Sequence, residues 1–258
     1  MNPNCLYLTV DLVVLAIPLV CSFDRKVRFV RFWPALFPAI AIMMALFIPW
    51  DIAFTEHGIW GFNPDYLSGL WIAGIPLEEW LFFICIPYAC LFTYESLKHY
   101  VPSPIGKPFA IPASSLLAVL CACLAAALAD RWYIGLTCAL TALLSAGLSH
   151  GARWPTVREW NHRLWFAYLP LLVPFILSNG VLTGIRFWQY PAINRDVDAI
   201  ADQIVWYNND HNLQLRIFSM PVDDLVYGFL MIAMTVVAYE MIARRLGLVT
   251  GSAPEPRP

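Results

Sequence analysis

Seven long apolar runs dominate this sequence of 258 residues and limit what it can fold into. Each has roughly the 20 mostly apolar residues that an α-helix needs to cross a bilayer. Only 13% of the residues are charged, against about 25% in a typical soluble domain. We therefore expect an all-α integral membrane protein with seven transmembrane helices. The predicted spans are 5–23, 33–53, 76–95, 111–129, 132–149, 163–184 and 221–243.

Two stretches of the sequence repeat one another at a fixed spacing. Residues 76–95 begin with Pro, carry the adjacent acids Glu78 and Glu79, and end in Tyr-Glu. Residues 221–240 do the same with two Asp, so the last Glu stands nineteen positions after the Pro in both stretches. We interpret this as an internal duplication, in which one extra span gives both copies the same direction in the membrane. The predicted organisation is two homologous three-helix repeats at 1–100 and 131–245, a linking span at 101–130 and a disordered tail at 246–258.

An aromatic residue and an Asn precede each acidic pair. Trp60 stands sixteen residues before the Pro of the first pair, and Trp206 stands fifteen before the Pro of the second. Asn63 and Asn208 follow these Trp residues. Trp is common at membrane interfaces, but its repetition together with an Asn favours a role in structure or in a site. Parallel repeats of this kind place a site at their mutual interface.

The positive charges separate between alternate loops. Twelve Lys and Arg residues fall on one side of the predicted membrane and four on the other. Cytoplasmic loops carry the excess of Lys and Arg, so we expect the N-terminus outside, the C-terminus in the cytoplasm and a bacterial inner membrane as the location. Both acidic pairs then lie at the outer ends of their spans. Glu95 and Glu240 lie at the cytoplasmic ends, where Lys98 and Arg244 favour interfacial ion pairs.

The acidic pairs are the strongest candidates for chemistry, because carboxyl groups at membrane depth are costly and usually mark function. The alternative is that they only complement the positive end of the helix dipole. Two adjacent carboxyl groups repel, and burial disfavours their charge, so at least one is suited to stay protonated near neutral pH. Such an acid in an aromatic cavity is suited to protonate an alkene, and aromatic faces hold the cation that forms. The candidate catalytic residues are Glu78, Glu79, Asp223 and Asp224, and the candidate substrate-binding residues are Trp60, Asn63, Trp80, Phe82, Phe83, Trp206, Asn208 and Tyr227.

Three further polar residues fall inside or at the ends of the predicted spans. Asp51 and Asn179 end the second and sixth spans, and we expect them to line the same cavity as the acidic pairs. Asp11 lies inside the first span, where a place in the site and a bond to a neighbouring helix are equally open.

Several function classes are excluded by what the sequence lacks. The net charge of −2 offers nothing to nucleic acid. No dinucleotide-binding, Walker or GxSxG motif is present, and the five His have no metal spacing. The seven Cys show neither a disulfide framework nor a zinc pattern. We therefore expect a reaction without metal or cofactor.

The repeated motifs resemble those of the small-membrane-protein type of lycopene cyclase, in which two homologous three-span units form a heterodimer or are fused in one chain. The resemblance runs from about residue 6 to 245, in order in both halves. It is carried by residues 50–51, 58–63, 76–83, 206–209 and 221–224. It implies a redox-neutral lycopene β-cyclase, an isomerase of the intramolecular lyase type, that converts the ψ end groups of lycopene to β-ionone rings through γ-carotene to β-carotene. It also implies lycopene and other carotenoids within the bilayer as substrates, membrane lipid as the surroundings and carotenoid-pathway enzymes as partners.

Other functions stay open at this point. Another carotenoid cyclase, forming ε or γ rings or acting on a C50 carotenoid, differs only in where the proton is lost. A prenyl-transfer enzyme would need Asp clusters that bind magnesium. A non-catalytic isoprenoid-binding membrane protein, binding a carotenoid or a quinone, would make the acids dispensable, and a transporter is a weaker alternative.

Overall fold

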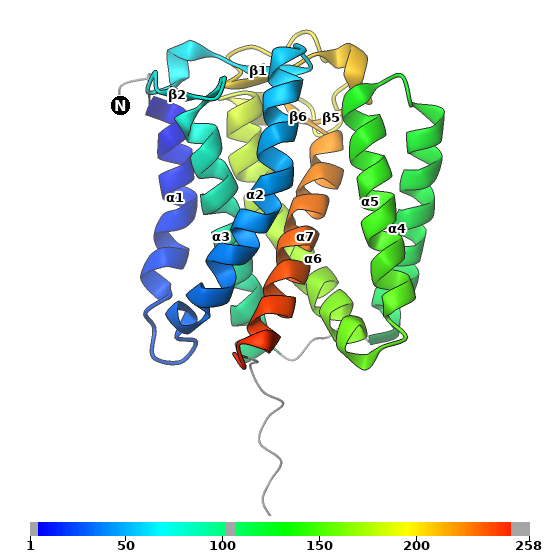
Figure 1. Ribbon diagram of the computed structural model, residues 1–258. Coiled ribbons are helices and arrows are strands. Elements are labelled where there is room, and N and C mark those ends of the chain that lie inside the picture. Colours follow the sequence, from blue (N-terminus) through cyan, green and yellow to red (C-terminus); the bar gives the residue numbers. More distant parts are fainter. Residues whose placement is uncertain (1–4, 102–106, 249–258) are drawn as a thin grey trace, which may run out of the picture.

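The computed structural model describes residues 5–101 and 107–248, which form a bundle of seven α-helices (Figure 1). The helices run side by side, and the strands and longer loops gather at one end, which we call the strand end. The helices are α1 (Leu6–Cys21), α2 (Trp33–Glu56), α3 (Leu77–Tyr100), α4 (Lys107–Ala127), α5 (Trp132–Gly151), α6 (Pro155–Thr183) and α7 (Asp223–Arg245).

The helices follow the predicted spans in order, with two differences. Six of the helices in the described part are long and apolar enough to cross a membrane. α1 has only 16 residues and reaches about 24 Å, less than the roughly 30 Å of a hydrocarbon core, so its crossing stays a prediction. α6 begins at Pro155 rather than 163, because Pro is favoured at the first helical turn and the polar residues after it continue the helix. Most of the predicted tail, residues 249–258, lies outside the described residues.

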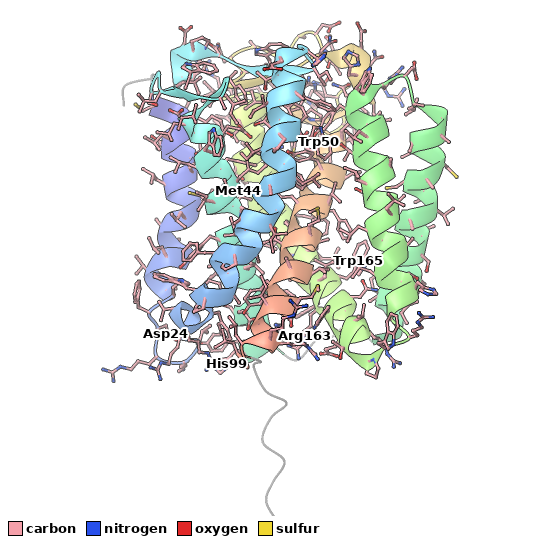
Figure 2. All side chains as sticks on the ribbon, in the orientation of Figure 1. Asp24, Met44, Trp50, His99, Arg163 and Trp165 are labelled. Atoms are coloured by element: carbon pink, nitrogen blue, oxygen red, sulfur yellow. The ribbon has the colours of Figure 1, made fainter. Side chains whose placement is uncertain are left out.

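Apolar side chains cover the outside of the bundle. Ile17 on α1 is 72% exposed, and Leu143 on α5 is 71% exposed. The polar residues labelled in Figure 2, Asp24, His99 and Arg163, lie at the end opposite the strands. Exposed apolar surface of this extent is unusual for a protein in water and suits helices whose outer faces meet lipid.

α3 and α7 lie at the centre of the packing. α1 packs on α3, while α2 and α5 both pack on α7. α4 packs on α5 and α6 at the edge of the bundle. The helices that begin with the acidic pairs are therefore the ones that the other helices surround.

A short two-stranded ribbon joins the two halves at the strand end. β1 (Trp60–Phe62) pairs antiparallel with β4 (Val205–Tyr207), and Gly61 stands opposite Trp206 at its centre. On one flank Asn63 N–H donates to Ile204 O at 2.8 Å, and on the other Asn208 N–H donates to Ile59 O at 2.9 Å. Each bond is the counterpart of the other when the strands are exchanged, so the ribbon has approximate two-fold symmetry.

The loops that follow the ribbon, residues 63–79 and 208–224, share one hydrogen-bond pattern, and we call them the acid loops. Each begins with an Asn whose side chain accepts a backbone N–H and caps a short 3₁₀ turn. Each continues into a hairpin with a two-residue turn just before the acids. Ala73 and Gly74 have φ of 51° and 87°, as the mirror-image turns of tight hairpins require. The elements are η3 (Pro64–Tyr66), β2 (Trp71–Ile72), β3 (Ile75–Pro76), η5 (Asn209–His211), β5 (Arg216–Ile217) and β6 (Met220–Pro221), with further 3₁₀ turns η2 (Phe29–Phe32) and η4 (Phe187–Gln189) elsewhere.

Crossed hydrogen bonds join α3 and α7 at the opposite end of the bundle. Tyr94 OH donates to Glu240 at 2.7 Å, and Tyr239 OH donates to Glu95 at 3.0 Å. Lys98 forms ion pairs with both carboxylates. The ion pairs predicted for this end are therefore present, but one Lys serves both. These matched contacts support the predicted duplication, which stays a prediction.

Arg244 contacts residues other than Glu240, the partner that the sequence suggested. Its side chain donates to Thr156 Oγ1 at 3.0 Å and lies over the ring of Trp160. Because Lys98 reaches Glu240 from α3, the carboxylate already has its cation.

Candidate active site

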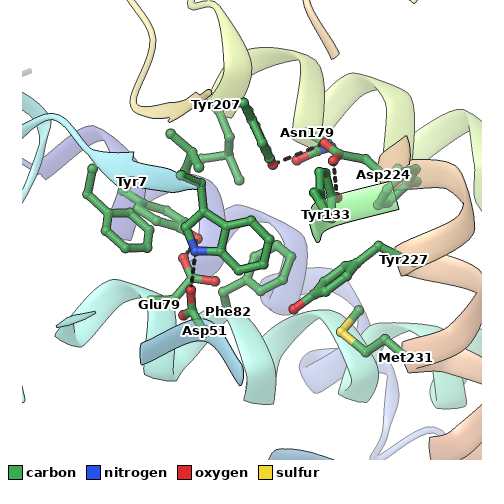
Figure 3. A pocket seen from close by; sticks show the side chains of 16 residues that line it. Tyr7, Asp51, Glu79, Phe82, Tyr133, Asn179, Tyr207, Asp224, Tyr227 and Met231 are labelled. Carbon is green, nitrogen blue, oxygen red and sulfur yellow. Dashed lines mark hydrogen bonds between the residues drawn. The ribbon is translucent and has the colours of Figure 1, made fainter. Parts of the chain in front are cut away.

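A cavity of about 50 Å³ lies inside the bundle beside the ribbon (Figure 3). Its lining comes from α1, α2 and α3 in one half, from α5, α6 and α7 in the other, and from both strands of the ribbon. Asp51, Glu79 and Asp224 reach it, so we call it the carboxyl cavity. Figure 3 shows Asp51 and Glu79 together at one end and Asp224 beside Asn179 at the other. One cavity is thus built from the acids of both halves.

The end of the cavity near α3 holds two carboxyl groups with few donors. Tyr7 OH donates to Glu79 Oε2 at 2.5 Å. Trp60 Nε1 donates to Asp51 Oδ1 at 2.6 Å, whereas Asp51 Oδ2 is buried without a hydrogen-bond partner. Two buried carboxyl groups side by side cannot both carry charge at low cost. This end is therefore suited to keep one of the two carboxyl groups protonated.

The end near α7 holds one carboxylate with three donors. Asp224 Oδ1 accepts from Tyr133 OH at 2.5 Å. Asp224 Oδ2 accepts from Asn179 Nδ2 at 2.6 Å and from Tyr207 OH at 3.2 Å. Hydrogen bonds donated to a carboxylate stabilise its charged form, so this end is suited to carry negative charge.

A buried cation stands beyond this second end. Arg216 is 1% exposed and donates to Ser219 O at 2.6 Å and to Asn209 Oδ1 at 3.0 Å. Its guanidinium carbon lies 5.8 Å from the centre of the Tyr207 ring. Burial lowers the pKa of Arg216, while burial and the neighbouring Asp224 raise the pKa of Tyr207 well above its usual range. The first acid loop has the exposed Trp71 at the corresponding hairpin position, so the two ends differ in charge.

Aromatic rings fill the space between the two ends. The Tyr227 ring lies 5.3 Å from Trp50, 6.0 Å from Trp60 and 6.0 Å from Tyr133, measured between ring centres. Phe82 also lines the cavity. Aromatic faces attract a cation in a site that excludes water. Of the predicted substrate-binding residues, Trp60, Phe82 and Tyr227 are therefore in the cavity.

The two acids of each pair have different positions. Glu78 Oε1 accepts the N–H of Ser68 at 2.6 Å, and Asp223 Oδ1 accepts the N–H of Leu213 at 3.1 Å. Neither lines the carboxyl cavity. Successive helix residues point about 100° apart, so the first acid faces its loop and the second faces the cavity. Among the four predicted catalytic residues, the geometry brings Glu79 and Asp224 together and leaves Glu78 and Asp223 as anchors of the acid loops.

The other predicted substrate-binding residues lie outside the cavity lining. Asn63 and Asn208 cap their 3₁₀ turns with their side chains. Trp206 covers Gly61 and is 39% exposed. Trp80 donates to a loop carbonyl at 3.2 Å, and Phe83 is fully buried against Phe47 and Phe82.

Trp60 and Trp206, which stand sixteen and fifteen residues before their Pro, do not occupy matching positions in the two halves. In both acid loops the capping Asn stands thirteen residues before the Pro. Trp60 therefore corresponds to Val205, and Tyr207 corresponds to Phe62. The backbone hydrogen bonds set this register, whereas the shared aromatic identity suggested another.

Tyr7, Tyr133 and Tyr207 were not among the predicted site residues. Each donates its hydroxyl to a cavity carboxylate. Tyr7 and Tyr133 stand in the first turns of α1 and α5. This shared position is the sequence feature that could have identified them as site residues. The prediction for Asp51 and Asn179 is confirmed, since both line the cavity. Asp11 is buried and has no hydrogen-bond partner, so it neither lines the cavity nor bonds a neighbouring helix.

The fold and cavity together define a class of protein: a helical membrane protein whose two halves supply carboxyl groups to one aromatic cavity. Within residues 5–101 and 107–248, no group of three or more His, Cys, Asp or Glu is placed to hold a metal ion.

The family of the chain follows from comparison with known proteins. The family model described as lycopene cyclase matches residues 4–97 and 130–242. The chain therefore belongs to the lycopene cyclase family. Apart from residue 130, the two matched regions fall within the two predicted repeats, and they leave out α4. No curated protein and no solved structure gives a significant match.

Proposed function

We propose that this membrane protein of the lycopene cyclase family is a lycopene β-cyclase whose two halves share one active site. The carboxyl cavity is the observation that supports this most. It contains a pair of carboxyl groups with few donors, Asp51 and Glu79, and a buried carboxylate that accepts three hydrogen bonds, Asp224, with aromatic rings between them. An acid, a base and a surface for a cation are what a redox-neutral ring closure requires.

The first step is protonation of the terminal double bond of a ψ end group. Glu79, protonated because it is buried beside Asp51, gives its proton to the alkene, whose π electrons form the new C–H bond. The hydrogen bond from Tyr7 OH stabilises the negative charge left on Glu79. A tertiary carbocation forms, and the faces of Tyr227 and Trp60 are positioned to stabilise it.

The second step closes the ring and removes a proton. The π electrons of the internal alkene attack the cation and form a carbon–carbon bond, which moves the charge onto a ring carbon. Asp224 accepts a proton from the neighbouring carbon, and the C–H electrons become the ring double bond. The proton then returns to the Asp51–Glu79 end, so the reaction consumes none. Loss of the proton from the position that gives the conjugated β ring follows from the family resemblance.

The orientation of the molecule is part of the same proposal. The distribution of Lys and Arg supports an external N-terminus and a cytoplasmic C-terminus. A bacterial inner membrane is the location that we propose. The carboxyl cavity then lies near the outer surface, with lycopene and other carotenoids reaching it from the bilayer.

Expression in a lycopene-accumulating bacterial host, followed by chromatography of the pigments, tests the proposal. Wild-type protein should convert lycopene to β-carotene. Glu79→Gln should lower conversion at least about 100-fold, because a positioned acid contributes about that factor or more. Glu78→Gln is the matched control, since its amide oxygen can still accept the Ser68 N–H, and it should keep most of the activity.

Two results would contradict the proposal. Unchanged lycopene in cells that contain well-inserted wild-type protein would contradict the cyclase activity. Rings of the ε type in the product would show that the protein is a cyclase but not a β-cyclase. Equal activity of Glu79→Gln and wild type would remove the assigned proton donor.

A further inference from the structure

A larger apolar space adjoins the carboxyl cavity. It has a volume of about 530 Å³ and is lined by residues of α1, α3, α6 and α7, and we call it the groove. It follows α1 from Thr9 to Pro18, about 14 Å at about 1.5 Å per residue. Ile17 on α1 and Leu177 on α6 line it and are 72% and 54% exposed. The groove therefore opens to the lipid-facing surface between α1 and α6.

The polar groups of the groove are already used by the protein. Four hydroxyl groups line it, and each donates to a backbone carbonyl oxygen at 2.7 to 2.9 Å. They belong to Thr9, Thr93, Tyr168 and Ser178. A quinone or a lipid headgroup placed here would leave its oxygens without donors, which is costly away from water. A hydrocarbon chain loses nothing, so the groove fits an apolar polyene.

One aromatic ring separates the groove from the carboxyl cavity. Phe175 on α6 and Gly228 on α7 line both spaces. A Cβ atom on Gly228 would lie 3.1 Å from Phe175 Cζ, so the ring rests directly against the bare backbone of α7. The wall between the two spaces is therefore narrow at this point.

The carboxyl cavity is too small for an end group while this ring is in place. Its volume is about 50 Å³, about a third of the roughly 150 Å³ of a cavity that binds benzene. The groove, at about 530 Å³, has the size of sites that bind drug-sized ligands. An end group that reaches Glu79 must therefore come with an enlargement of the cavity, and Phe175 is the side chain whose rotation joins the two spaces.

We propose that the groove binds the polyene chain of the carotenoid and that the Phe175 ring turns aside to admit its end group to the carboxyl cavity. This inference rests on the proposed function for its ligand, an extended apolar polyene that enters from the bilayer. The rest of the chain stays among the lipid acyl chains outside α1 and α6.

Retention of pigment by a protein that cannot turn it over tests the groove. Glu79→Gln protein, purified in detergent from lycopene-accumulating cells, should carry bound lycopene that is measured by its visible absorbance per protein. Adding Val14→Phe, which fills the groove, should lower this ratio about tenfold. Adding Val119→Phe, the same change on the 60% exposed lipid face of α4, should leave it unchanged. Gel filtration checks that both proteins stay folded.

The Phe175 wall has its own test. Phe175→Trp in the Glu79→Gln background should keep most of the bound lycopene, because the other residues that line the groove are unchanged. The same change in otherwise wild-type protein should lower conversion about tenfold, because the larger ring has less room to turn beside Gly228. Unchanged conversion by Phe175→Trp would overturn the role of the wall.

The outcomes separate this inference from the proposed function. Retention that Val14→Phe does not reduce, or purified protein that carries acyl lipid alone, would overturn the groove while conversion by wild type still stood. Lycopene that is retained, and lost with Val14→Phe, in a protein whose wild type forms no rings would support the groove and contradict the cyclase.

Discussion

The Trp206 ring packs against Gly61 at the centre of the ribbon that joins the two halves, and a Cβ atom on Gly61 would be 2.3 Å from this ring. The strands on either side carry residues that line the carboxyl cavity. Close contact at this one position therefore sets the separation of the two halves where the acids meet.

We expect Gly61→Val to separate β1 from β4. Overpacking of this kind costs about 1–3 kcal/mol, and the displaced strands would also carry Trp60 and Tyr207 away from their carboxylates. Thermal unfolding in detergent and pigment conversion should both fall. Gly147→Ala is the control, since nothing lies within 4 Å of its Cβ position, and it should be neutral or slightly stabilising. Full activity of Gly61→Val would show that the ribbon does not position the site.

Removal of the two helix-start tyrosine hydroxyls should have unequal effects. Tyr7→Phe takes away the donor to Glu79 Oε2, whereas Tyr133→Phe leaves Asp224 with Asn179 and Tyr207. A hydrogen bond to a charged group contributes about 1.5–3 kcal/mol, so Tyr7→Phe should slow conversion roughly 10- to 100-fold. Tyr133→Phe should slow it by less. Initial rates with lycopene in membranes give the comparison, and the reverse order would contradict the assigned roles.

The second acidic pair should divide its roles as the first does. Asp224→Asn removes the base that faces the cavity and should lower conversion at least about 100-fold. Asp223→Asn keeps an oxygen that can accept the Leu213 N–H, so it should lose far less. Chromatography of pigments from cells with equal protein levels measures both. Equal losses for the two variants would mean that the loop anchor and the cavity acid are not distinct.

Lys98 should matter for stability and not for chemistry. It lies at the end away from the cavity and pairs with two largely buried carboxylates, Glu95 and Glu240. Leaving buried charges without their partner costs about 3–5 kcal/mol, so Lys98→Ala should unfold at lower temperature and accumulate poorly. The rate per folded molecule should stay close to that of wild type. Lys26→Ala, an exposed Lys, is the control that should change neither quantity.

Hydropathy alone located the helices, because the bilayer demands an apolar length that few other structures need. The repeated acids indicated where the site lies. The sequence could not show which acid of a pair faces the cavity, since Glu78 and Glu79 differ only by a turn of about 100° whose direction depends on packing. It also hid Tyr7 and Tyr133, because loops of unequal length give them a spacing of 126 residues where the acids are 145 apart.

The ribbon and the crossed Tyr–Glu bonds fasten the same two halves at opposite ends of the bundle. No described residue of α4, which connects the halves along the chain, lines the carboxyl cavity. The cavity therefore does not require the two halves to be connected in one chain. Two polypeptides, one ending after α3 and the other beginning at α5, would together contain every carboxyl group of the cavity and the contacts that bring them together.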